Sequence, residues 1–173
     1  MPATVSVKER NGSGPTDTTV TTAVFSASDV PAPGTANPMV RPGTGGTNFS
    51  FWKHLFLNAD TTPAVTINNV TWYTDGTIGF GTGLTLKAGT RATYTQATGT
   101  TGTSGTDAAT GLSITMTAAG IYIVSAPLAV PGSVTNPATG KITDFLVLQI
   151  TIAETAGPGV LATETSTWGY DEV

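Results

Sequence analysis

The sequence predicts an all-β protein, and three observations carry this prediction. Apolar and polar residues alternate with a period of two in many short runs, which is typical of strands with one buried face. Of the 173 residues 36 are Thr, a β-branched residue that suits a pleated surface. The runs are separated by 21 Gly and 11 Pro, while Glu and Lys number only four each. We expect an antiparallel β-sandwich or jelly-roll-like domain of about eight to ten strands.

The clearest alternation lies in the C-terminal stretch, residues 143–173. Every second position of residues 146–152 is Leu or Ile, and the positions between them are more mixed. A Gly/Pro turn at residues 156–159 separates this run from a second alternating run at residues 160–170. Two long runs joined by such a turn predict an antiparallel hairpin. We expect this hairpin to form the central pair of a sheet.

A second pair of runs occupies residues 49–58 and 64–74, and it is also expected to form a hairpin around Pro63. Within the second run the apolar positions change sides, because Ile67 and Val70 are separated by three positions and not by two. An extra residue in one strand restores a common face. The sequence therefore predicts a β-bulge at Asn68 and Asn69.

The remaining expected strands are shorter. They cover residues 84–87 and 91–95 on either side of Ala88-Gly89, residues 112–118, and residues 121–130, where Pro127 favours an edge or a bend. The glycines at 79, 81 and 83 predict an irregular edge and not a phosphate loop, since no Lys-Ser/Thr follows them. Residues 96–111 contain nothing larger than Gln and are expected to form a mobile Thr/Gly-rich loop.

Residues 1–47 differ in composition from the rest of the chain. Residues 4–10 and 18–26 alternate like short strands, but residues 29–47 hold four Pro and four Gly and little apolar mass. So long an irregular segment is usually functional or a linker. The sequence predicts an extended N-terminal arm over residues 1–47 and one β-sandwich domain over residues 48–173.

Composition argues against several classes of protein. Charged residues make up 10% of the chain, the net charge is −4, and the seven Lys and Arg are scattered, so nucleic acid is not an expected partner. No apolar run is long enough for a membrane helix, and we expect neither a membrane association nor a secretory signal. There is no Cys, and the sequence predicts no metal site and no cofactor. Low charge also suits a protein that packs against copies or partners.

Catalytic residues are not indicated by any motif. His54, the single histidine, lies in an apolar run and is expected to be structural. Asp60, Asp75, Asp107 and Asp144 each lie in or beside a turn, where Asp bonds its own backbone, and nothing pairs two carboxylates for glycoside hydrolysis. We expect a protein that is not an enzyme.

Four segments carry a resemblance to a known group of proteins. They are the opening TVSVKERNGSG, the Pro-rich NPMVRPGTGGTNFSFWKHLFL, the run TINNVTWYTDG, and the close DFLVLQITIAETAGPG followed by TWGYDE. In style and order the chain resembles the small virion structural proteins of tailed bacteriophages. The resemblance implies a β-sandwich accessory protein made in the host cytoplasm and located in the phage particle. Among such proteins, capsid decoration (cement) proteins commonly form homotrimers on the outer capsid surface.

Three functional hypotheses follow from the sequence. The first is a capsid decoration protein whose arm contacts its own copies or the major capsid protein by adding to a sheet edge, with Val5, Val7, Val20 and Phe25 as expected partner contacts. The second is a neck, tail or baseplate component, which ring symmetry would distinguish. The third, of another class, is a carbohydrate-binding module or glycan-active jelly roll that would use exposed tryptophans from the set Trp52, Trp72 and Trp168.

Overall fold

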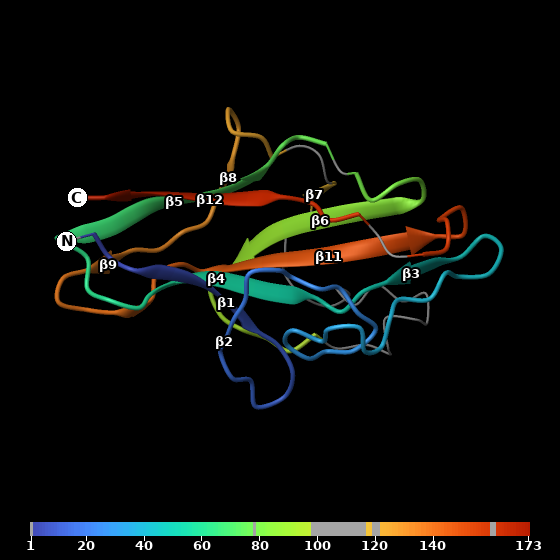
Figure 1. Cartoon of the computed structure of the whole chain (residues 1–173), viewed down its shortest axis with the longest axis horizontal. Coiled ribbons are helices and arrows are strands. Elements are labelled where there is room, and N and C mark those ends of the chain that lie inside the picture. Colours follow the sequence, from blue (N-terminus) through green and yellow to red (C-terminus); the bar gives the residue numbers. More distant parts are fainter. Residues whose placement is uncertain (1, 78, 98–116, 119–121, 160–161) are drawn as a thin grey trace.

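The computed structural model describes residues 2–77, 79–97, 117–118, 122–159 and 162–173. These residues form twelve strands in two antiparallel sheets, and no helix occurs among them. In Figure 1, β5, β8 and β12 lie along the top of the view, the long strands β6, β11, β4 and β1 lie below them, and the N- and C-termini are at the same end. The predicted all-β antiparallel sandwich is therefore confirmed.

The larger sheet has eight strands, with β11 in its middle. β11 pairs with β4 on one side and with β6 over eight residue pairs on the other. The path runs β2-β1-β4-β11-β6-β7, and β10 and β3 extend it by pairing with β4 and β11. The strands are β1 (Val5–Arg10), β2 (Thr18–Thr19), β3 (Thr47–Phe49), β4 (Lys53–Ala59), β6 (Leu84–Arg91), β7 (Thr117–Ala118), β10 (Gly140–Lys141) and β11 (Phe145–Ala153).

The smaller sheet has four strands built around β5 (Thr66–Thr74), which pairs with β8 (Leu128–Ala129), β9 (Val134–Thr135) and β12 (Ser166–Glu172). Thr71 of β5 pairs with Gly169, but Asn68 pairs with Asp171, so β5 takes three steps where β12 takes two. The extra residue belongs to β5, where Asn69 has a φ of 50°. The predicted bulge at Asn68-Asn69 is confirmed, and β12 itself is regular.

Neither expected hairpin forms. β11 lies in the larger sheet and β12 in the smaller one, and β4 and β5 are divided in the same way. The loops after β4 and β11 therefore carry the chain from one layer to the other and do not return it beside the same strand. Period-two alternation identifies a strand and its buried face but says nothing about the identity of its partner.

Other strand boundaries also differ from expectation. Residues 84–91 form one continuous strand, β6, where two short ones were expected. Of the expected strand at residues 121–130, residue 121 lies outside the described residues, and residues 122–130 do not form a single strand, because a bridge from Ile123 to Ala126 closes a tight turn before β8. Residues 98–111 of the expected mobile loop and residues 112–116 of an expected strand lie outside the described residues, while 117–118 form β7.

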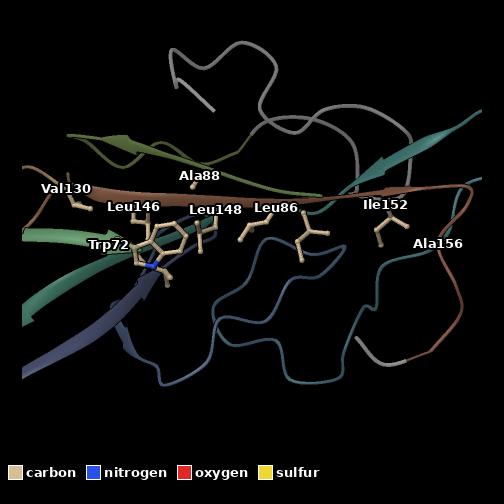
Figure 2. Packing of buried hydrophobic residues seen from close by; sticks show 10 residues of the cluster. Trp72, Leu86, Ala88, Val130, Leu146, Leu148, Ile152 and Ala156 are labelled. Atoms are coloured by element: carbon tan, nitrogen blue, oxygen red, sulfur yellow. The ribbon is translucent and has the colours of Figure 1, made fainter. Parts of the chain in front are cut away.

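The interior of the sandwich holds two apolar clusters. One gathers alternate residues of β11 and β6 against Trp72 of β5, and Figure 2 shows Leu146, Leu148, Leu86 and Ile152 in a row along the larger sheet, with Trp72 beside Leu146. The other packs Leu57 and Ala59 of β4 against the smaller sheet: Ile67, Val70 and Val134. Alternate side chains of β11 and of β4 therefore point into the interior, as the period of two along a strand requires.

A third apolar cluster lies on the outer face of the larger sheet. The alternate residues of β4 and β11, Phe56, Phe145 and Val147, pack there with Phe51, Trp52 and Ala97. Lys141 Nζ lies 4.1 Å from the centroid of the Phe145 ring, and the Arg10 guanidinium lies 5.4 Å from it. All seven residues of β4 are buried, so this sheet is covered on both faces.

Candidate interaction surface

The four apolar residues expected to contact a partner pack within their own chain in this structure. Val7, Val20 and Phe25 lie against the cluster around Trp72, and Val5 joins Val7 on the second interior cluster. β1 is bonded to β4 over its whole length, from the pair Val5–Ala59 to the pair Arg10–His54. This part of the expected arm thus contributes a strand to the folded sheet, and a contact between these residues and a partner stays a prediction.

A buried ion pair fixes the segment that follows β1. Lys53 Nζ donates to Glu9 Oε1 at 2.7 Å, and both side chains have no exposed surface. Lys53 also donates to the carbonyl of Val30 at 2.8 Å, and Ala32 N–H donates to Glu9 Oε2 at 3.2 Å. Two charges inside a sandwich need each other and further hydrogen bonds to be tolerated. The pair therefore ties the Pro-rich segment to the sheet, which is a structural role.

Among the described residues, His54 lies in an aromatic cluster. Its ring lies within aromatic-contact distance of Trp52, Tyr94 and Phe145, and neither ring nitrogen has a hydrogen-bond partner among the described residues. Burial, with the charges of Arg91 and Lys53, lowers the pKa of His54 to about 3. The imidazole is therefore neutral at physiological pH, and it lacks the orienting acceptor and the nucleophile of a triad in the described part of the chain.

Two of the three tryptophans considered for glycan binding are buried. Trp52 is 0% exposed and Trp72 is 2% exposed, so neither can stack on a sugar, and Trp168 is half-buried against the core. Across the described residues there is also no group of three or more His, Cys, Asp or Glu placed to hold a metal ion.

The smaller sheet, in contrast, has one face on which no described strand packs. Since Ile67, Val70 and Trp72 point inward, the alternate side chains of β5 and its neighbours point outward. Hydroxyl, amide and small side chains dominate this outer face, which comprises Thr66, Asn68, Thr71, Tyr73, Ala129, Thr135, Thr167, Gly169 and Asp171. Its carboxylate, Asp171, accepts a 2.8 Å hydrogen bond from Asn69 Nδ2. We call this set of residues the open face.

The open face ends at a strand with a free side. β12 is bonded to β5 along one edge, and no described strand lies along the other. The other path ends of the two sheets, β2, β7 and β8, are two-residue strands, whereas β12 has seven residues. Short edge strands, Lys and Pro are among the usual protections against pairing with another chain, and β12 has none of these three. Its two charged residues, Asp171 and Glu172, accept hydrogen bonds within the chain.

Sequence reasoning missed both the open face and the free edge of β12. The expected hairpin placed β12 beside β11 in the middle of a sheet, where it would have no free edge. One signal was present: residues 163–167 alternate Thr with small or polar residues and carry less apolar mass than residues 146–152. Lower apolar content is typical of a strand with one solvent-exposed face, and higher apolar content is typical of a strand that is buried on both faces.

Comparison of the chain with protein-family models, with curated proteins and with solved structures gave no match. In the described part of the chain, no helix has the length and apolar character that crossing a membrane requires.

Proposed function

We propose that this protein is a non-enzymatic structural component of a phage particle, most specifically a capsid decoration protein. In this role a homo-oligomer, by resemblance a trimer, binds the outer surface of the major capsid protein and stabilises the head. The observation that carries the proposal is the asymmetry of the sandwich. One sheet is covered on both faces, while the other offers the open face and the free edge of β12.

The chemistry of the open face suits contact with another protein. Hydroxyl and amide groups form hydrogen bonds with a partner at a lower desolvation cost than charges do, and non-obligate interfaces are depleted of charged residues at their centres. Thr is stiff at χ1, so little side-chain entropy is lost when such a face is covered. The low charge of the whole chain, 10% of residues, agrees with such a role.

The copy number of the protein in purified particles tests the proposal. Quantitative mass spectrometry against the major capsid protein is expected to give hundreds of copies per particle for a decoration protein. Six or twelve copies would indicate the neck, tail or baseplate alternative, and absence from particles would reject the virion role.

A binding experiment then tests the open face itself. Purified protein is added to particles stripped of it, and the bound amount is measured against concentration. The variant Thr71→Lys places a charge in the middle of the open face and is expected to weaken binding at least about tenfold. Lys substitution at exposed Ser125, outside that face, is the matched control and is expected to bind as the unmodified chain does.

A further inference from the structure

The free edge of β12 has the properties of a strand that pairs with a copy of itself. Val173 exchanges both backbone hydrogen bonds with Thr66, and β12 is regular from there back to Ser166. In an antiparallel ladder, alternate residues turn their backbone groups to opposite sides. The N–H and C=O groups of Ser166, Trp168, Tyr170 and Glu172 therefore face the free side.

We propose that two copies of this chain associate through β12, antiparallel and about a two-fold axis at Gly169, so that the two smaller sheets join into one continuous sheet. This inference concerns self-association and does not depend on the virion function. A two-fold edge contact closes on two copies, so it is separate from the trimer contact that the resemblance implies.

The sequence of β12 is complementary to itself in this register. With Gly169 opposite Gly169 of the second copy, Trp168 lies opposite Tyr170, and both belong to the hydrogen-bonded pairs of the new ladder. Aromatic cross-strand pairs stabilise antiparallel sheets. Tyr170 is 40% exposed in the single chain, although it lies on the same side of β12 as half-buried Trp168. The pairing would cover this side chain.

The charges at the end of β12 do not oppose each other in the paired form. Asp171 falls opposite Thr167 of the second copy, and Glu172 falls opposite Ser166. Both carboxylates also have partners within their own chain: Asp171 accepts from Asn69, and Glu172 Oε1 accepts from the N–H groups of Ala3 and Ala64 at 2.9 and 3.1 Å. Like charges that face each other across strands destabilise a sheet, and this register avoids them.

Glycine at the two-fold position permits the close approach of the two backbones. In the proposed register the Gly169 residues form a non-hydrogen-bonded pair, in which the Cα atoms are closest, about 4.5 Å apart. A Cβ at Gly169 would lie 3.0 Å from Thr71 Oγ1, so a larger residue would also crowd the open face.

The experiment measures molar mass against concentration by analytical ultracentrifugation, from about 1 to 200 μM. The unmodified chain is expected to show a reversible monomer–dimer equilibrium. Tyr170→Lys places a charge in the aromatic pair, and it is expected to raise the dimer dissociation constant at least about tenfold. Tyr73→Lys makes the same chemical change on the same sheet but away from the free edge, and it is expected to leave the dimer unchanged.

A second variant tests the strand register, and its result does not depend on whether the Tyr170→Lys variant folds. The chain has no cysteine, so Gly169→Cys in a Thr71→Ala background provides a single thiol at the two-fold position. Mild oxidation is expected to give a disulfide-linked dimer, whereas a thiol placed at exposed Ser125 is expected to stay largely uncrosslinked. A chain that stays monomeric at 200 μM, or a dimer that Tyr170→Lys leaves intact, would overturn the proposal.

Discussion

The two sheets of this sandwich are covered to different extents, and the difference shows how one chain can combine a rigid body with a free surface. The larger sheet has apolar clusters on both faces and a buried ion pair, and β4 is buried at every residue. The smaller sheet shares one interior face, and no described strand covers the other, where the side chains of β5 are half-buried or exposed. We therefore expect stability to depend mainly on the larger sheet and association to depend on the smaller one.

The largest effect is expected from breaking the buried ion pair. Lys53→Met leaves the Glu9 carboxylate buried without its cation, and it should lower the free energy of unfolding by about 3–5 kcal/mol. Urea denaturation followed by circular dichroism measures this loss. The double variant Glu9→Leu/Lys53→Met removes both charges and is expected to recover most of it. If the single and double variants were equally unstable, the loss would come from packing and not from the charge.

Acid is expected to destabilise the larger sheet through His54. The folded-state pKa is lowered to about 3, so between pH 6.5 and 3 the unfolded chain binds a proton that the folded chain does not. Stability is therefore fully present above pH 6.5 and falls with pH, by about 3 kcal/mol at pH 4. Denaturation midpoints across this range test the prediction. In His54→Phe, whose ring replaces the imidazole among Trp52, Tyr94 and Phe145, this part of the pH dependence should disappear.

Substitutions on the outer faces of the two sheets should lower the free energy of unfolding by different, smaller amounts. Val147 is 0% exposed on the outer face of the larger sheet, and Val147→Ala should cost about 2 kcal/mol through lost burial and a cavity. Thr71→Ala on the open face should stay within about 0.5 kcal/mol. Thermal unfolding of both variants checks the contrast. Equal losses would mean that the open face is packed as tightly as the covered one.

The sequence predicted the strands better than their partners. Alternation identified β4, β5, β11 and β12 as strands and sorted the side chains of each onto two faces, because side-chain periodicity is a local property of an extended chain. It could not show that each consecutive pair is divided between two sheets, because a short Gly/Pro loop can return a strand beside its neighbour or cross to the opposite layer. Because the expected hairpin placed β12 beside β11 in the middle of a sheet, the free edge of β12 was not predicted.

The alternation of apolar and polar residues also could not predict which polar residues are buried. Lys53 occupies an inward position in an apolar run, and only the fold brings Glu9 of β1 beside it to make that position tolerable. The bulge at Asn69, by contrast, was predictable. A change of apolar side within one run has few physical explanations, and Asn is among the few non-glycine residues that readily adopt a positive φ.

The smallest effect is expected at the backbone of the smaller sheet. The bulge at Asn69 allows Ile67, Val70 and Trp72 to share the interior face, so the packing of this sheet depends on one residue with a φ of 50°. Asn69→Ala forces a Cβ-bearing residue without a compensating side-chain hydrogen bond into that conformation, and it should cost about 1 kcal/mol.

Asn69→Gly separates the two contributions at this position. Glycine adopts the positive φ without strain but loses the hydrogen bond to Asp171, so the variant should be close to neutral in urea denaturation. A loss as large as that of Asn69→Ala would assign the effect to the hydrogen bond and not to the backbone. With the expected result, the smaller sheet would owe its shape to a single backbone conformation, while its exposed side chains would be free to serve a partner.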